Sequence, residues 1–456
     1  MKFGGTSVAD AEAMTRVIDI VRQQLARHPN HKPPVVVVSA MSKVTDRLVE
    51  TGRLAGDRQA GQAAQVVGDL LARHVAVAAS LVHGEALDAL TALLTQDFTE
   101  LAGQVREWAA HGDVSPRSTD ALLAMGELAS SRMVAAAFAA QQIPCVWVDS
   151  RRVLVTDSDH TSAVPDIDAT CARTRSLVGA ERDAGRIPVM GGFIGATADG
   201  VTTTLGRGGS DYSAAIFGAC LDVDEIQIWT DVDGMLTADP RVVAGPRLVP
   251  QLSFAEASEL AYFGAKVLHP STILPAVAKN IPVRILNSRR PEVKGTMITA
   301  EGRGAAGELT ALACKRGVTV IDITSTRMLM AHGFLRRLFE VFERFKISVD
   351  VVTTSEVSVS VTVDNTRRLD DVISNLRKFA EVNVERDMAI VCLVGENLRA
   401  DATLFGRAVT SLEKVPLRLV SQAASRRNIT FVLRDADVPD AMNSLHDRFF
   451  TASVAS

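Results

Sequence analysis

Short runs of β-branched residues alternate with Ala- and Leu-rich helical stretches through the first part of the chain, and this alternation constrains the fold most. Strand-like runs occur at 34–39, 143–148, 187–194 and 225–231, and helical stretches at 68–94 and 118–140. Strands that alternate with helices form a mostly parallel sheet covered on both faces. The sequence therefore predicts an α/β fold, whose ligands bind beyond the carboxyl ends of the strands.

A glycine-rich segment precedes one of the predicted helices. Thr202–Tyr212 combines Arg207, Asp211, three glycines and four Ser or Thr hydroxyls, and a helical run follows at 213–219. Glycines let a ligand approach the main chain closely, and the start of a helix presents free N–H groups to an anion. An arginine can bind a carboxylate or a phosphate with two parallel hydrogen bonds. The segment therefore indicates a site for a small acidic metabolite and phosphate groups.

The N-terminus has a similar pattern. Lys2, Phe3, Gly4 and Gly5 lead into a helical pattern at 9–21. The order differs from a P-loop, where the lysine follows the glycines, and from the glycine pattern of dinucleotide-binding folds. Amide donors and one ammonium group can nevertheless face phosphate oxygens here.

Length and composition exclude several classes of protein. A chain of 456 residues predicts two or three domains. The formal net charge of −4 argues against a nucleic-acid partner. No apolar run reaches the roughly 20 residues of a membrane span, and the start lacks a signal-peptide pattern. The five cysteines show no metal or disulfide spacing, so we expect reduced thiols and a cytoplasmic location.

The last third repeats a smaller βαββαβ-type unit and contains no catalytic constellation. An extra strand at 309–314 precedes the strand at 318–324, and it is expected to complete the second copy. We therefore predict a sensing or docking module made of two such units. The predicted boundaries are a catalytic domain at 1–290, a linker at 291–307, a first unit at 317–384, and a second unit at 308–316 plus 385–452.

With these motifs in view, the chain resembles aspartate kinase, of the monofunctional kind with two C-terminal ACT domains. The resemblance covers nearly the whole chain and rests on several motifs in order. They are Lys2–Ser7, Gly126–Leu128, Thr203–Tyr212, Trp229–Asp231, Thr237–Arg241, Phe263–Pro270 and Ser348–Glu356. The fold implied is the amino-acid-kinase fold followed by two α+β ACT units of ferredoxin-like type.

The resemblance implies transfer of the γ-phosphoryl group of ATP to the side-chain carboxylate of L-aspartate, the first step toward lysine, threonine and methionine. An ionised carboxylate needs no general base, so catalysis is expected to be positioning plus charge neutralisation. Mg²⁺ would be held mainly by the nucleotide phosphates, with no protein metal site. The implied catalytic residues are Lys2 and Asp211, and the implied nucleotide contacts are Gly4, Gly5, Thr230, Asp231, Arg241 and Lys266.

For the substrate, the resemblance implies that Arg207 binds the α-carboxylate and Glu127 the ammonium group. The other implied substrate contacts are Ser39, Thr45, Gly208 and Ser210. Several of these residues have ordinary structural alternatives. Lys2 and Lys266 could be solvated lysines, Glu127 could form a structural salt bridge, and Arg241 could belong to a plain turn.

The chain departs from the family pattern at two places. Leu236 stands where several relatives carry a tyrosine, which removes a ring for adenine stacking. Only Met1 precedes Lys2, so either the first strand is short or the true start lies upstream. His269 is expected to be structural rather than catalytic.

Relatives bind an end-product amino acid between paired ACT units, which implies feedback inhibition and a homodimer or larger assembly. Lysine is the favoured effector, with threonine or both as alternatives; Met330, Ala331 and His332 differ from some relatives. The implied effector contacts are Met328, Gly333, Phe334, Leu335, Val349, Asp350, Ser355 and Glu356.

Three other functions stay open. A kinase of similar fold could act on glutamate, acetylglutamate, carbamate or a nucleotide, although the ACT pair argues against it. A non-catalytic amino-acid sensor would not need Lys2, Glu127, Arg207 and Asp211 together. An NAD-dependent dehydrogenase would need the glycine fingerprint that this chain lacks.

Overall fold

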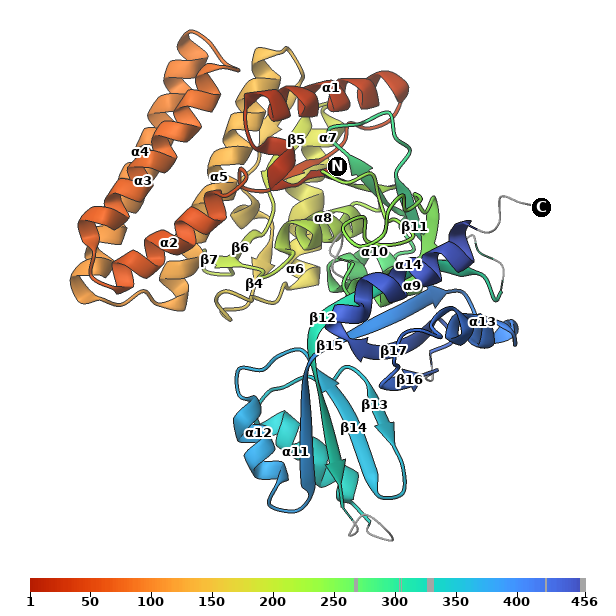
Figure 1. The fold of residues 1–456 in the computed structure, drawn as a ribbon. Helices are drawn as coiled ribbons and strands as arrows, with labels where there is room; N and C mark the ends of the chain where they lie inside the picture. Colours follow the sequence, from red (N-terminus) through yellow and green to blue (C-terminus); the bar gives the residue numbers. More distant parts are fainter. Residues whose placement is uncertain (266–269, 303, 305, 326–331, 423–424, 452–456) are drawn as a thin grey trace. The chain divides into compact units, whose positions relative to one another are not determined.

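The computed structural model describes residues 1–265, 270–302, 304, 306–325, 332–422 and 425–451. It divides into two compact units, which are described separately (Figure 1). The first comprises Met1–Met235 and Leu268–Ala300, and the second comprises Leu236–Val267 and Glu301–Ser456. Residues 236–265, which the predicted catalytic domain includes, thus belong to the second unit. The predicted domain boundaries remain a prediction.

The first unit is built on the expected sheet. Its strands follow the order β3-β5-β2-β1-β8-β10-β11, and neighbours are parallel except β10 and β11. The central strand β1 is only two residues long. The bounds are β1 Lys2–Phe3, β2 Val36–Val38, β3 Cys145–Trp147, β5 Ile187–Gly191, β8 Ile226–Thr230, β10 Val283–Asn287 and β11 Thr296–Thr299.

Helices cover both faces of this sheet because the central strands are apolar on both sides. Val36 and Val38 join the core formed with α1 to α5, whereas Val37 joins the core formed with α8. The alternation confirms the buried parallel strand that the β-branched run predicts. The bounds are α1 Ala11–Arg27, α2 Val44–Gly56, α3 Ala60–Ala79, α4 Glu85–His111, α5 Pro116–Ala140, α6 Ile167–Arg173, α7 Ala180–Asp183, α8 Gly209–Cys220 and α10 Leu274–Ala278.

A small sheet carries the glycine-rich segment. Its strands are β4 (Val155–Thr156), β6 (Ile194–Thr197) and β7 (Thr202–Thr204), in that order. β7 leads through residues 205–208 directly into α8. The glycine-rich segment is therefore fixed at both ends by regular structure.

The second unit contains a six-stranded antiparallel sheet of order β13-β14-β12-β15-β17-β16. One core packs under α11 and α12, and another under α13 and α14. Its elements are β9 Gln251–Ser253, α9 Phe254–Tyr262, β12 Leu309–Thr324, α11 Phe334–Arg344, β13 Val352–Thr354, β14 Ser358–Val363, α12 Leu369–Leu376, β15 Glu381–Gly395, α13 Leu404–Ser411, β16 Leu419–Ser421, β17 Asn428–Arg434 and α14 Val438–His446.

Several sequence expectations differ from the structure. The strands predicted at 309–314 and 318–324 are one strand, β12, because β15 pairs with it along its length with a register shift near Arg316. The helical stretch predicted at 68–94 is interrupted between α3 and α4, where Gly84 has a φ of 61°. The linker predicted at 291–307 contains β11, which hydrogen-bonds to β10.

The expectation of five reduced cysteines is wrong for one pair. Cys171 of α6 and Cys220 at the end of α8 form a disulfide with a Cα–Cα distance of 4.7 Å. These cysteines are 49 residues apart in sequence, so only the packing of α6 against α8 brings them together. Cys145, Cys314 and Cys392 are free thiols.

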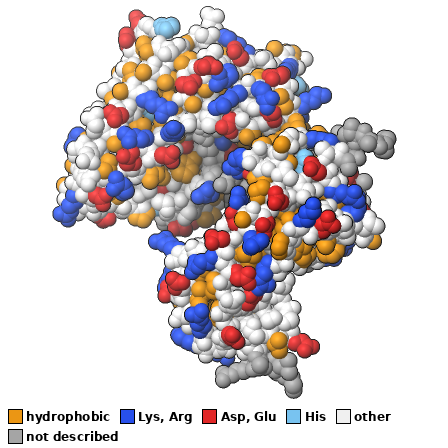
Figure 2. Space-filling view, in the orientation of Figure 1, with side chains coloured by type: hydrophobic (Ala, Val, Ile, Leu, Met, Phe, Trp, Pro, Cys, Tyr) orange, Lys and Arg blue, Asp and Glu red, His pale blue; other side chains and the backbone are white. Residues whose placement is uncertain are grey.

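Surface charge and one long helix bear on the environment of the chain. Lys, Arg, Asp and Glu side chains are interspersed on the face drawn in Figure 2, as on a solvated surface. Helix α5 is long and apolar enough to cross a membrane by length and composition, but 72% of its most apolar window is buried inside the protein. Because so much of α5 lies in the core, it is better explained as a core helix.

Candidate functional site

The ion pair between Lys2 and Asp211 lies at the carboxyl end of β1. The Lys2 ammonium is 2.7 Å from a carboxylate oxygen of Asp211, and the two side chains are only 10% and 16% exposed. Lys2 comes from β1 and Asp211 from the first turn of α8. The N-terminal motif that contains Lys2 and the glycine-rich segment that contains Asp211 are far apart in the sequence. This ion pair shows that they lie together in the fold.

The Gly-Gly turn after β1 is held tightly by its neighbours. A Cβ on Gly5 would lie 2.8 Å from the carbonyl oxygen of Ala40, so this position requires glycine. The N–H of Gly4 donates to the carbonyl of Trp229 at 3.0 Å. The expectation that Gly4 offers this N–H to a phosphate is therefore not met, because the neighbouring strand β8 already accepts it.

Glu127 is a buried carboxylate with one oxygen unpaired. Oε1 accepts a hydrogen bond from the N–H of Ala40 at 3.0 Å, whereas Oε2 is buried without a hydrogen-bond partner among the described residues. Burial raises the pKa of Glu127 to about 8, although the Ala40 N–H and the Lys2 ammonium partly oppose this. The alternative of a structural salt bridge for Glu127 finds no partner in the described part of the chain, and the buried oxygen suits a cationic ligand.

The end of β5 packs directly against the start of α8. A Cβ on Gly192 would lie 2.7 Å from Cβ of Ser210 and 2.8 Å from its Cα, and one on Gly191 would lie 3.0 Å from the carbonyl oxygen of Glu127. These two glycines let β5, α5 and α8 converge. Ser210 thus joins Asp211 and Glu127 at the same edge of the sheet.

We expect Gly192→Ala to displace the first turn of α8. The added methyl group should lower the free energy of unfolding by about 1–3 kcal/mol and reduce kcat/KM by at least about tenfold. Urea denaturation and steady-state kinetics would measure both effects. Gly68→Ala in α3 is the control because a Cβ there meets nothing within 4 Å. Unchanged kcat/KM in Gly192→Ala would contradict this packing.

Arg207 projects from the loop between β7 and α8. It is flanked by Gly206 and Gly208, both with a φ of 74°, and its side chain is exposed. No ion pair or hydrogen bond of its guanidinium occurs within the described ranges. The left-handed glycines shape the loop, and Arg207 has its donors available for an anion.

The other site residues predicted in the first unit lie at or shortly after the carboxyl ends of β2 and β8. Ser39 follows β2, and its carbonyl accepts a hydrogen bond from Ser130 of α5. Thr45 is in the first turn of α2, and Ser42 in the preceding loop donates its N–H to the Gly5 carbonyl. Thr230 ends β8, with its hydroxyl 3.3 Å from Asp231.

Two predicted nucleotide contacts, Arg241 and Lys266, stay predictions. Arg241 belongs to the second unit, where it is exposed and forms an ion pair with Asp239 at 2.6 Å. Leu236 belongs to the same unit. Lys266 and His269 lie outside the described residues.

Sequence reasoning missed Ala40, whose main-chain N–H holds Glu127. Its residue type carries no signal, since any residue but proline has that donor. It also missed Gly191 and Gly192 as packing positions. Two consecutive glycines at the end of a strand could have indicated such a close approach.

The predicted effector residues surround α11 and the strand that follows it. Gly333 precedes α11 with a φ of 84°, and Phe334 is buried against Phe379, whereas Leu335 is exposed. Val349 is half-buried beside the same core. Ser355 bonds the Ser358 hydroxyl at 2.7 Å, and Glu356 is exposed. Met328, Met330 and Ala331 lie outside the described residues.

The Asp350 carboxylate is bound by two side chains of the same unit. One carboxylate oxygen accepts from the Lys315 ammonium at 2.8 Å and from the Tyr262 hydroxyl at 3.0 Å. The other oxygen is buried without a hydrogen-bond partner among the described residues. Burial and the carboxylate raise the pKa of Tyr262, so its hydroxyl remains a donor. Asp350 is thus already bound by a lysine of the same chain.

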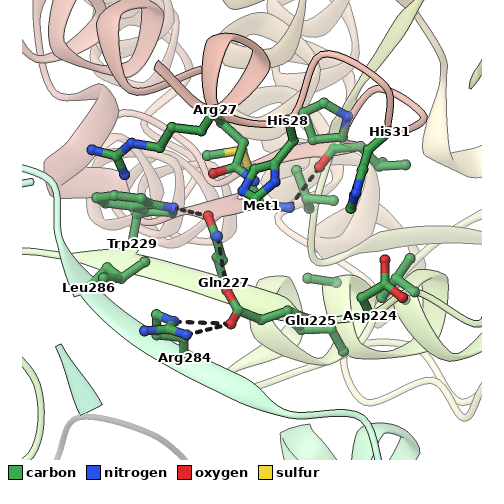
Figure 3. A pocket seen from close by; sticks show the side chains of 18 of the residues that line it. Met1, Arg27, His28, His31, Asp224, Glu225, Gln227, Trp229, Arg284 and Leu286 are labelled. Atoms are coloured by element: carbon green, nitrogen blue, oxygen red, sulfur yellow. Dashed lines mark hydrogen bonds and ion pairs between the residues drawn. The ribbon is translucent and has the colours of Figure 1, made fainter. Parts of the chain in front are cut away.

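A cavity of about 730 Å³ lies away from these residues (Figure 3). It is lined by Met1, Val35 and Ile226, at the amino ends of β1, β2 and β8. Arg284 and Glu225 form an ion pair at its wall. None of the predicted site residues lines it, so this cavity is separate from the chemical site.

Family models and individual relatives both match this chain. The model of the amino acid kinase family matches residues 1–287, and an ACT domain model matches residues 391–449. The chain is 38% identical to aspartokinase 3, chloroplastic, of Arabidopsis thaliana, over 99% of this chain and 81% of the relative. It is 35% identical to lysine-sensitive aspartokinase 3 of Escherichia coli, over 98% of each.

Solved structures also match nearly the whole chain. Aspartokinase III of E. coli in complex with aspartate and ADP, in the R-state, matches with a TM-score of 0.81 at 34% identity, over 98% of this chain and 99% of that one. The same enzyme in complex with lysine and aspartate, in the T-state, also gives 0.81, at 33% identity and 98% coverage of each chain.

Proposed function

This chain belongs to the aspartokinases, and from that premise we propose which of its residues carry out the reaction. It is a kinase that transfers the γ-phosphoryl group of ATP to the side-chain carboxylate of L-aspartate, a phosphotransferase with a carboxyl acceptor, giving 4-phospho-L-aspartate. The observation that best supports the residue roles is the Lys2–Asp211 pair beside the unpaired oxygen of Glu127. An ammonium and two carboxylates at one sheet edge suit a zwitterionic acid substrate.

L-Aspartate carries one ammonium and two carboxylates, and the site offers complementary groups. We assign the ammonium to Oε2 of Glu127, which has no other partner among the described residues. We assign the α-carboxylate to Arg207, whose exposed fork can bind it bidentately. Ser39, Thr45, Gly208 and Ser210 would complete the walls. Held at both α-groups, the substrate would direct its side chain toward Lys2.

Phosphoryl transfer to a carboxylate brings two anions together, so charge neutralisation is the main requirement. Lys2 would neutralise charge on the transferring group, and its ion pair with Asp211 would orient it. Gly5, Thr230 and Asp231 would contact the nucleotide, as would Arg241 and Lys266. Mg²⁺ would neutralise phosphate charge when bound with ATP. We assign it mainly to the phosphate oxygens of the nucleotide.

Regulation is proposed from the ACT units. The E. coli relative is called lysine-sensitive, and one of its structures contains lysine. We propose lysine as the effector of this chain, with threonine or both as alternatives, bound near Asp350, whose buried Oδ2 suits an ammonium. A homodimer or larger assembly through paired ACT units, and a cytoplasmic location, are proposed on the same basis.

The proposed function is tested by hydroxamate formation. Hydroxylamine traps an acyl phosphate, so the assay with Mg-ATP and L-aspartate reports the product directly. We expect signal with L-aspartate, none with L-glutamate, and suppression by L-lysine. Suppression by L-threonine instead would correct the effector. No signal from folded protein would favour a sensor, and a signal with L-glutamate alone would favour a related kinase.

A further inference from the structure

Asp120 is a buried carboxylate that has no part in the site described above. It lies in the first turns of α5 and is fully buried. Oδ1 accepts from the Thr204 hydroxyl at 2.5 Å and from the Thr161 N–H at 3.0 Å. Oδ2 lies within hydrogen-bond distance of Nδ1 of His160, at 2.6 Å. Three partners from two separate segments compensate the burial of this charge.

Both of these segments adjoin the loop 205–208, which carries Arg207. Thr204 ends β7, three residues before Arg207. Thr161 has a φ of 72°, which is unusual for a β-branched residue, and its carbonyl oxygen lies 3.2 Å from where a Cβ on Gly206 would be. The loop 157–165, which contains Thr161, also donates the N–H of Ala163 to the Thr204 carbonyl at 2.9 Å. The loop 157–165 therefore packs against the loop that carries Arg207 and restricts its position.

The helix that carries Asp120 also carries Glu127. The two residues are seven positions apart, or two helical turns, and so they lie on nearly the same face of α5. A helix is stiff over two turns. A bond from Asp120 to β7 and the loop 157–165 therefore connects the Arg207 loop to Glu127 through rigid structure.

We propose that Asp120 is a positioning residue that holds the Arg207 loop at a fixed place relative to Glu127 and so sets the aspartate site. This role rests on the proposed binding of the substrate by Arg207 and Glu127. His160 and Thr161 extend the same contact to the supporting loop. Asp120 itself touches neither substrate nor nucleotide.

The fold of this region does not depend on Asp120 alone. The hydroxyls of Thr203 and Thr156 bond each other at 2.7 Å, which fixes β7 to β4 independently. Loss of the Asp120 contacts should therefore loosen the Arg207 loop without releasing the strand. The expected consequence is weaker aspartate binding with little change for ATP.

The test is steady-state kinetics of full-length Asp120→Asn, His160→Ala and His160→Asn, with KM determined separately for L-aspartate and ATP. We expect KM for L-aspartate to rise about tenfold in Asp120→Asn and several-fold in His160→Ala. KM for ATP and kcat should stay within about threefold. His160→Asn keeps a side-chain N–H and should recover most of the loss. Asp97→Asn, which removes the ion pair of Arg132 on the same helix, is the matched control.

Each outcome decides the proposal. A lower melting temperature with unchanged KM for L-aspartate in Asp120→Asn would make its role merely structural and overturn the proposal. Equal rises in both KM values would also overturn it. Should Asp120→Asn fail to fold, the two His160 variants decide in the same way. A wild-type protein that does not phosphorylate L-aspartate would instead refute the proposed function, and calorimetric titration of L-aspartate would then still test the positioning role.

Discussion

Lys2→Met is expected to lower kcat by about a thousandfold or more while the protein still folds. Methionine replaces the aliphatic stem with an unbranched chain one atom shorter and removes the charge that would stabilise the transferring phosphoryl group. Preorganised charges of this kind contribute roughly two to five orders of magnitude in rate. The Lys2 side chain is only 10% exposed, so bulk water cannot replace the ammonium. Hydroxamate formation at saturating L-aspartate and ATP would measure kcat.

A double variant separates catalysis from stability. Lys2→Met leaves Asp211 nearly buried and unpaired, which should lower the free energy of unfolding by about 3 kcal/mol. Adding Asp211→Asn removes the uncompensated charge and should recover most of that stability, measured by urea denaturation. It should not recover kcat. A double variant that regains both, or a single variant with kcat within tenfold of wild type, would assign the pair a structural role only.

Glu127→Gln is expected to stabilise the unliganded protein at pH 8 and to weaken L-aspartate binding by about a hundredfold or more. Glutamine keeps the hydrogen bond from Ala40 but does not ionise. The variant cannot pair with the substrate ammonium, and loss of a buried charged partner costs about 2–5 kcal/mol. Calorimetric titration and melting temperatures with and without L-aspartate would measure both effects.

The pH dependence of this effect has a definite sign. The pKa of Glu127 is raised from 4.5 to about 8 in the folded protein, so between these values the folded state keeps a proton that the unfolded state releases. The contribution of Glu127 to stability is therefore full below pH 4.5 and falls as the pH rises toward 8, in total by a few kcal/mol. Glu127→Gln should lack this slope, and its advantage should grow from pH 5 to pH 8. Parallel stability profiles would show that Glu127 is not desolvated.

The parts of the fold that follow local periodicity could be predicted from the sequence. The run of valines at Val36–Val38 predicts a buried parallel strand, and each of its residues faces a helix layer. Ser253 and Glu256, three positions apart, form a capping box at the start of α9. Such features depend on neighbours within a few residues. Element boundaries were less predictable, since β12 continues through Arg316 only because β15 lies beside it.

The candidate site was predictable where a side chain itself carries the chemistry, as for Lys2, Glu127, Arg207 and Asp211. It was not predictable where the main chain or a distant contact decides. The Gly4 N–H is used by Trp229, and Ala40 holds Glu127 through its backbone. Asp120 gives no motif at all, because its partners come from a loop and a strand far along the chain.

The pairing of β12 with β15 has a consequence for the nascent chain. Residues 309–316 pair with residues 389–395, so the first half of β12 leaves the ribosome well before its partner exists. At roughly 5–20 residues per second, the delay is on the order of 4–16 seconds. During that time the backbone edge of this segment has no β15 strand to pair with, and Leu312 lacks the core in which it packs. We therefore expect a chaperone to protect the first half of β12 during synthesis.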